Sequence, residues 1–186
     1  MIMANDKHHR QSIRLQGYDY SQPGVYFVTI VTRDRQCLFG EIVDGEMKLN
    51  DAGRAVEDEW LNTPQVRIQV ELDEYVVMAN HIHGILVIAD HRSRGVLQYA
   101  PTFRSPSQTV GAIVRGFKSA VTKRINTIRG TPGLPFWQRN YYERVIRNED
   151  ELDRVRQYIA NNPLQWALDQ ENPANPAVGT QHAVRF

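Results

Sequence analysis

The stretch YVVMANHIHGILVIAD, residues 75–90, decides how this chain folds. It consists of two runs of β-branched and large apolar residues separated by Asn80. Such runs are typical of buried strands, so we expect strands over residues 69–79 and 81–89 that meet near Asn80. Both runs are too short to cross a bilayer as a helix.

Further strands are predicted on both sides of this stretch. The run VYFVTIVT, residues 25–32, has the β-branched and aromatic composition of a buried central strand. Residues 37–50 predict a hairpin, because Asp44-Gly45 is a favoured two-residue turn between apolar runs. Residues 141–147 predict one more short strand.

Three segments have the features of helices. Residues 51–61 follow Asn50 and Asp51, either of which would cap a helix. Residues 107–129 place apolar side chains at intervals of three and four, with basic side chains on the other face. Residues 149–162 follow Asn148, which forms a capping-box pattern with Glu151. The order of elements predicts an α+β fold with a ferredoxin-like antiparallel sheet and helices packed on one face.

The length and composition predict one domain of a cytoplasmic protein. The 186 residues include a single cysteine, Cys37, so no disulfide within the chain is possible. We expect a flexible N-terminal tail over residues 1–12, a domain over 13–168, and a loose C-terminal tail over 169–186. No segment has the length of a transmembrane helix, and we expect no membrane partner.

The charges are unevenly distributed although the formal net charge is only +1. Residues 37–74 contain ten acidic and three basic residues, whereas residues 104–147 contain nine basic residues and one acidic residue, Glu143. The second region would present a positive field to a phosphate backbone. The alternative is a solvated helix face whose counter-charges come from the acidic segment.

Two histidines in the motif Asn80-His81-Ile82-His83-Gly84 are candidates for metal ligands. Residues i and i+2 of a strand point to the same face, so His81 and His83 would present their imidazoles side by side. Two histidines on one strand supply half of a divalent-metal site. The alternative is a pair of structural histidines that hydrogen-bond to backbone or carboxylate groups.

A second candidate group lies on the last predicted helix. Tyr158 and Asn162 are four residues apart and therefore share one helical face, with Arg154 one turn earlier. The amide oxygen of Asn162 is a hard ligand that suits Mg²⁺ or Mn²⁺. The alternative is that Tyr158 is an ordinary half-buried aromatic residue and Asn162 only ends the helix before Pro163.

Together these motifs resemble the single-tyrosine HUH transposases, and in particular the REP-associated tyrosine transposases. The resemblance covers about residues 14–166. Its parts are YDYSQPGVYFVTIVTRDRQCLFG, YVVMANHIHGILVI and WQRNYYERVIRNEDELDRVRQYIANNP. It implies a ferredoxin-like core, His81 and His83 as the histidine pair on a central strand, Tyr158 as the nucleophile, and Asn162 as a third ligand of Mg²⁺ or Mn²⁺.

The function expected from this resemblance is cleavage and transfer of single-stranded or hairpin DNA of the REP type through a 5′-phosphotyrosine intermediate. The enzyme would act as a monomer or a homodimer. Basic and aromatic side chains would contact the DNA. The candidates are Arg104, Arg115, Lys118, Lys123, Arg124, Trp137 and Arg154.

Two other functions fit the same residues. A non-enzymatic ferredoxin-like nucleic-acid-binding protein would use the sheet and the basic helix and would form no covalent adduct. A metal-dependent phosphodiester hydrolase would use His81 and His83 with water as the nucleophile, and it would not need Tyr158.

Overall fold

The computed structural model describes residues 22–89 and 109–175 of the 186-residue chain. The tail expected over residues 1–12 lies outside these ranges, and so does Arg104. Among the described residues, no helix combines the length and the apolar character that crossing a membrane would require.

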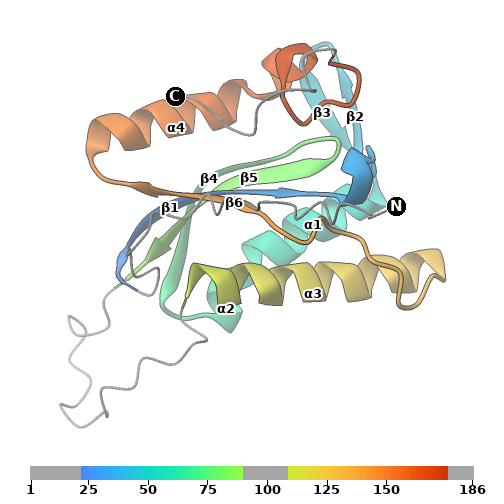
Figure 1. Ribbon diagram of the computed structural model, residues 1–186, viewed down its shortest axis with the longest axis horizontal. Coiled ribbons are helices and arrows are strands. Elements are labelled where there is room, and N and C mark those ends of the chain that lie inside the picture. The colour runs from blue at the N-terminus through green and yellow to red at the C-terminus, as the bar shows by residue number, and fades with distance from the viewer. Residues whose placement is uncertain (1–21, 90–108, 176–186) are drawn as a thin grey trace, which may run out of the picture.

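Four strands form the main sheet: β1 (Gly24–Val31), β4 (Val70–Val77), β5 (His81–Ile88) and β6 (Tyr142–Ile146). Their order is β4-β5-β1-β6, and every neighbouring pair is antiparallel. The helices α1 (Asp51–Leu61) and α3 (Val110–Arg129) follow β1 and β5 along the chain, as Figure 1 shows. This strand–helix–strand–strand–helix–strand order confirms the predicted α+β, ferredoxin-like sheet.

The remaining elements are inserted into this frame or follow it. A separate two-stranded sheet pairs β2 (Gly40–Val43) with β3 (Glu46–Leu49), and the one-turn helix α2 (Thr63–Val66) precedes β4. The chain then ends in α4 (Glu149–Asn161) and a 3-10 helix, η4 (Pro163–Leu168). Another 3-10 turn, η1 (Arg33–Arg35), follows β1.

Helices cover both faces of the sheet, and not one face as the sequence led us to expect. Tyr26, Val28 and Ile30 of β1 belong to the large core shared with α1 and α3, whereas Phe27 belongs to a smaller core with α4. Figure 1 shows α4 and α3 on opposite sides of the sheet. The reason is in β1 itself: both alternating sets of its side chains are large and mostly apolar, so each face must be covered.

The predicted helix caps are present. The Asn50 side chain accepts hydrogen bonds from two backbone amides at the start of α1, and Asn148 accepts one from the Glu151 amide at the start of α4. The long helix α3 begins after Thr109 and ends where Gly130 adopts φ 64°. Side-chain caps of this kind satisfy amides that have no partner within the helix.

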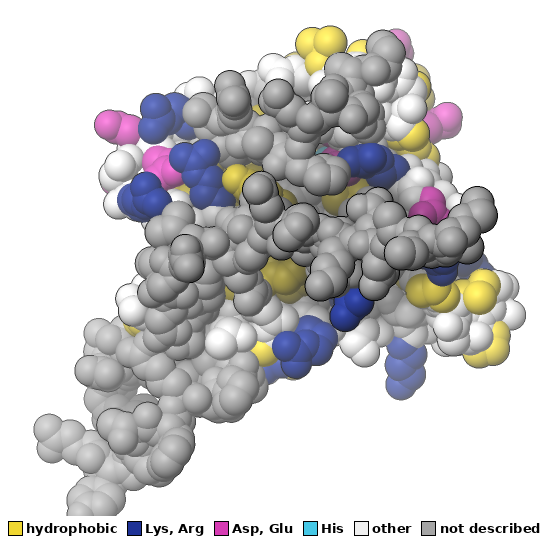
Figure 2. Space-filling model, viewed as in Figure 1, with side chains coloured by type: hydrophobic (Ala, Val, Ile, Leu, Met, Phe, Trp, Pro, Cys, Tyr) yellow, Lys and Arg dark blue, Asp and Glu magenta, His cyan; other side chains and the backbone are white. Residues whose placement is uncertain are grey.

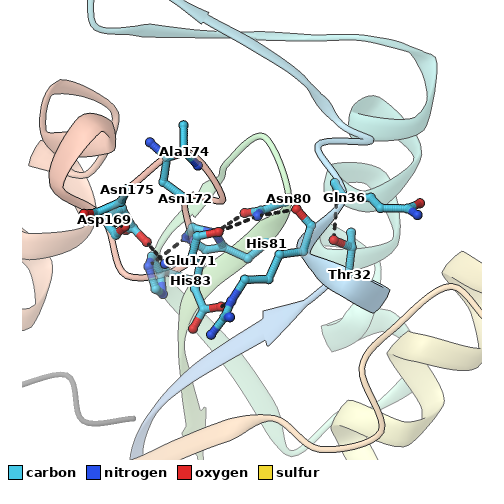
Figure 3. Close-up of polar contacts among 11 residues, drawn as sticks. Thr32, Gln36, Asn80, His81, His83, Asp169, Glu171, Asn172, Ala174 and Asn175 are labelled. Atoms are coloured by element: carbon cyan, nitrogen blue, oxygen red, sulfur yellow. Dashed lines mark hydrogen bonds and ion pairs between the residues drawn. The ribbon is translucent and has the colours of Figure 1, made fainter. Parts of the chain in front are cut away.

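Packed structure continues beyond residue 168, within the segment assigned above to a C-terminal tail. Residues 169–175 form turns, and Asn172 is buried. The Asn172 side chain donates to the Trp166 carbonyl and accepts from the Ala174 amide. This segment lies against the end of the sheet that carries His81, as Figure 3 shows.

Candidate functional site

The histidine pair lies on β5, one of the two central strands of the sheet. His81 is opposite Val31 and His83 is opposite Thr29 in the antiparallel register with β1. Both side chains are fully buried or nearly so, and their Nε2 atoms lie 3.0 Å apart. The His83 ring stacks on Phe27, whose side chain is in the α4 core, so the pair faces α4.

Asn80 determines which nitrogen of His81 carries the proton. Its side-chain nitrogen donates to the backbone carbonyls of Arg35 (2.9 Å) and Glu171 (2.7 Å), so its oxygen faces His81 Nδ1 at 2.8 Å. A carboxamide oxygen only accepts hydrogen bonds, and Nδ1 is therefore the donor. In the neutral ring, Nε2 then carries a free lone pair directed towards His83. Figure 3 shows this arrangement.

His83 has an equivalent partner in Thr29, whose hydroxyl oxygen lies 2.8 Å from Nδ1. A hydroxyl can either donate or accept. When His83 donates from Nδ1, both Nε2 lone pairs converge on one point, which is the arrangement that a cation requires. Burial lowers the pKa of His81 and lowers that of His83 well below its usual value, so both rings are neutral and able to act as ligands.

Tyr158 projects from α4 towards the Nε2 atoms of the histidine pair. Its hydroxyl lies 3.2 Å from His83 Nε2, and the two rings meet edge to face. Burial is the largest cause that raises the pKa of Tyr158 above its usual value, and the Asp169 carboxylate adds to it. A hydrogen bond from Asn162 acts in the opposite direction. The phenol is thus held neutral and needs a nearby positive charge to ionise.

Asn162 follows the last residue of α4 and has a buried side chain that is 2% exposed. Its oxygen, Oδ1, is one of three buried side-chain polar atoms for which the described residues supply no hydrogen-bond partner. Such a buried acceptor is costly unless a ligand satisfies it. Because Asn162 also contacts Tyr158, the unsatisfied oxygen lies beside the proposed nucleophile.

Asp169 is a site residue that the sequence analysis did not identify. It offers a carboxylate oxygen that lies, with one ring nitrogen each of His81 and His83, in a group of atoms within 4.8 Å of one another. The Trp166 ring, 6.0 Å from that of His81, belongs to the same C-terminal segment. An acidic residue so close after Asn162 was the available signal, but it lies in the segment predicted to be a loose C-terminal tail.

Two ion pairs hold α4 against the sheet. Arg156 makes two hydrogen bonds to Asp73 of β4, at 2.8 and 2.7 Å. The strand has a register shift between Leu72 and Tyr75, and Asp73 lies in this irregular segment. Near the start of α4, buried Glu151 pairs with Arg144 of β6. These contacts fix the helix that carries Tyr158.

The residues predicted to bind DNA are less uniform than the sequence suggested. Arg115 and Lys123 are exposed on α3, and Arg154 is exposed on α4. Figure 2 shows one face of the molecule, on which the visible Lys and Arg side chains lie at several separate places. Arg124 instead pairs with Asp58 and Glu59 of α1. In addition, α3 packs on the sheet face opposite the histidines, so its basic side chains are not beside Tyr158.

Lys118 and Trp137 have mainly structural contacts. The Lys118 amine donates to the carbonyls of Gln138 and Asn140, and burial lowers its pKa to about 8. The Trp137 ring is only 8% exposed and packs among Phe39, Phe117 and Phe136. The stacking of unpaired bases that we expected of Trp137 is therefore not possible for most of its ring.

The fold is that of a REP-associated tyrosine transposase. A structure of such a transposase bound to a REP hairpin superposes with a TM-score of 0.52 and 18% identity, covering 82% of this chain and 74% of that chain. No protein-family profile matches the sequence.

The chain is also 43% identical over 169 residues to an uncharacterized protein of Haemophilus influenzae. The match covers 88% of this chain and 93% of that protein. This chain belongs to the same family as the Haemophilus influenzae protein.

Proposed function

We propose that this protein is a single-tyrosine DNA strand transferase that cleaves single-stranded or hairpin DNA of the REP type and stores the bond as a 5′-phosphotyrosine. The observation that carries the proposal is the 3.2 Å approach of the Tyr158 hydroxyl to His83 Nε2. It brings a nucleophile from the last helix to a histidine pair on a central strand. The likeness in fold to a transposase bound to a REP hairpin supports the choice of substrate.

The residues around this point suit a divalent metal such as Mg²⁺ or Mn²⁺. His81 and His83 would supply two nitrogens, and Asn162 would supply the buried oxygen that otherwise has no partner among the described residues. Asp169 adds a candidate fourth ligand. When bound, the metal would draw charge from the scissile phosphate and favour the ionised form of the nearby phenol.

The chain's own groups account for the bond changes. The Tyr158 oxygen gives up its proton and attacks the phosphorus, and the bond to the 3′-oxygen breaks. The leaving oxygen takes up a proton and departs as a 3′-hydroxyl, so one proton is released and one is consumed. The phosphodiester energy is kept in the tyrosine–phosphate bond. Attack by another 3′-hydroxyl then restores a DNA strand and frees Tyr158, without a nucleotide cofactor.

The test is a covalent-adduct assay with labelled REP-type hairpin DNA and Mn²⁺ or Mg²⁺. We expect a denaturation-resistant protein–DNA species that is absent in Tyr158→Phe, while the variant binds the hairpin as the wild type does. Tyr142→Phe is a matched control, because Tyr142 packs in the same core as Tyr158. An adduct that persists in Tyr158→Phe would exclude this mechanism.

A second candidate is a metal-dependent phosphodiester hydrolase, and the carboxylate of Asp169 beside the histidines favours it. Under this reading Tyr158→Phe retains cleavage, and the product carries a free 5′-phosphate. The same assay therefore separates the two functions. A non-enzymatic nucleic-acid-binding protein would give neither the adduct nor cleavage.

A further inference from the structure

We infer that a groove beside the histidine pair binds the backbone phosphates of single-stranded DNA next to the scissile phosphate. The inference rests on the function proposed above. The groove has a volume of about 850 Å³. Its lining residues are Arg33, Asp34, Arg35, Pro135, Trp137, Gln138, Arg139 and Pro173.

The register between β1 and β5 places the groove next to the histidine pair. Val31, the last residue of β1, is opposite His81, and the groove begins two residues later at Arg33. The Thr32 amide donates to the Asn80 carbonyl at 2.8 Å, and the Asn80 side chain donates to the Arg35 carbonyl at 2.9 Å. The residue that orients His81 therefore also holds one wall of the groove.

The two main walls of the groove, residues 33–35 and residues 135–139, are joined by backbone hydrogen bonds. The Arg33 amide donates to the Phe136 carbonyl and the Gln138 amide donates to the Val31 carbonyl, each at 2.9 Å. Thr32 and Trp137 form a β-bridge between these bonds. The groove is thus a fixed feature of the fold, and not a gap between two independent loops.

The turn that carries two of the arginines has an uncommon backbone. Asp34 and Arg35 are consecutive residues with φ of 56° and 53°, in the left-handed region that glycine favours. Residues other than glycine adopt this region where the surrounding structure holds them, often at ligand sites. Arg33 and Arg35, on either side of Asp34 in this turn, both line the groove.

The charges of the lining suit a phosphodiester. Three guanidinium groups line the groove, against one carboxylate, that of Asp34, which is 72% exposed. Arg35 also pairs with Glu171 at 2.7 Å, from the segment that follows Asp169. Arg33 pairs more loosely with Asp34, at 3.5 Å, and both of these side chains are more than half exposed. Arg139 is also exposed. Guanidinium groups present paired donors that match the oxygens of a phosphate.

A single strand is the ligand that the proposed function implies, because the groove lies beside a site that would act on single-stranded or hairpin DNA. A second hollow, of about 720 Å³, shares Pro135 and Trp137 with the groove and contains Lys118 and Lys123 of α3. The two hollows therefore adjoin each other, and of these two lysines Lys123 is exposed whereas Lys118 is held by backbone carbonyls. Positive grooves that follow the backbone are typical of single-strand binding.

The test measures binding of the full-length protein to fluorescent (dT)20 over a range of salt concentrations. We expect the double variant Arg33→Ala/Arg139→Ala to bind roughly tenfold more weakly at low salt and to reduce the slope of log K against log [salt] by about 1.4. Arg54→Ala is the control, because Arg54 is an exposed arginine that does not line the groove. Arg33→Lys/Arg139→Lys should recover most of the slope.

Unchanged binding and slope in the double variant would overturn the inference, as would an equal loss in Arg54→Ala or a wild type that does not bind (dT)20. The strand-transfer proposal can fail independently of the groove inference. If the double variant loses binding but the wild type forms no Tyr158 adduct with hairpin DNA, the groove stands and the strand-transfer proposal fails. If the adduct forms but the double variant binds normally, the strand-transfer proposal stands and the groove inference fails.

Discussion

The side chain of Asn80 accepts a 2.8 Å hydrogen bond from His81 Nδ1 while its nitrogen donates to two backbone carbonyls. It therefore fixes the tautomer of His81. It also joins β5 to the turn that contains Arg35 and to the C-terminal segment that contains Glu171. We predict that Asn80→Ala lowers Mn²⁺ affinity by about 10–100-fold, the usual effect of removing a partner of a ligating histidine. Isothermal titration calorimetry measures this directly.

Asn80→Asp is the informative companion variant. It keeps an oxygen that accepts from His81 but loses both donations to backbone carbonyls, so we expect Mn²⁺ affinity closer to that of the wild type and a lower stability. If folded Asn80→Ala binds Mn²⁺ as tightly as the wild type does, Asn80 has no role in orienting His81.

Asp169 should contribute to metal binding because its carboxylate lies within 4.8 Å of the ligand atoms of His81 and His83. We predict that Asp169→Asn lowers Mn²⁺ affinity by roughly tenfold, since a charged oxygen ligand is replaced by a neutral one. Asp153→Asn, an exposed change on α4, is the control. Equal affinities of wild type and Asp169→Asn would remove Asp169 from the ligand set.

The stability of the metal-free protein should fall on mild acidification. Burial lowers the pKa of both His81 and His83 below the value of about 6.5 found in an unfolded chain. Below about pH 6.5 the unfolded state therefore binds more protons, and the free energy of unfolding falls by at most about 2.7 kcal/mol per pH unit for the two groups. Asp169 and Glu171 reduce the effect at His81.

Urea denaturation in EDTA at pH 7.5 and pH 5.5 measures this dependence. The stability is expected in full at pH 7.5 and is lost as the pH falls. His81→Gln/His83→Gln should show a flatter dependence across the same interval, whatever its absolute stability. An equally steep dependence in this double variant would assign the effect to other groups.

The pair of Arg156 and Asp73 should matter more for activity than for stability. The arginine is partly exposed, so its ion pair contributes little to the free energy of unfolding. It nevertheless fixes α4 two residues before Tyr158, and a small displacement of a reacting group can lower a rate about 100-fold. We predict that Arg156→Ala slows adduct formation with little change in melting temperature.

The charge-reversed double variant Arg156→Asp/Asp73→Arg tests whether the pair itself is responsible. Partial recovery of the adduct rate over either single variant would support positioning through this contact. Arg54→Ala, which removes an exposed ion pair with Asp51 on α1, should leave the rate unchanged.

The elements of the sheet could be predicted from sequence because the two central strands, β1 and β5, are dominated by apolar residues and the helices α1, α3 and α4 have clear caps. The sequence could not predict on which side of the sheet α4 packs, because the apolar stripe of this helix, Leu152, Val155 and Ile159, would fit either face. The decisive feature was β1, where Phe27 alternates with Tyr26 and Val28. An apolar run without alternation indicates burial on both faces.

The histidine pair and Tyr158 could be proposed from spacing and from the resemblance, and the structure brings them together, but the groups around them could not be predicted. Asn80, Thr29 and Asp169 reach the histidines through strand register and through a turn after η4, and neither is encoded in local spacing. For the basic region, the sequence indicates more free positive charge than the structure has. Its charge was evident, but the ion pairs of Arg124 and the burial of Lys118 depend on tertiary contacts.

Gly84, the last residue of the Asn80–Gly84 motif, is required for packing behind the histidines. A Cβ atom at this position would lie 2.3 Å from a ring carbon of Trp60, which is 1% exposed and has no room to move. We predict that Gly84→Ala destabilises the protein by about 1–3 kcal/mol, as overpacked cores do. Gly116→Ala is the control: in α3 the nearest atom to the added Cβ is 3.5 Å away, on the Arg67 side chain, and the change should stabilise by about 0.5–1 kcal/mol. Urea denaturation of both variants measures these changes in the free energy of unfolding. A Gly84→Ala protein as stable as the wild type would contradict the prediction, and it would mean that β5 and α1 can move apart without loss of stability.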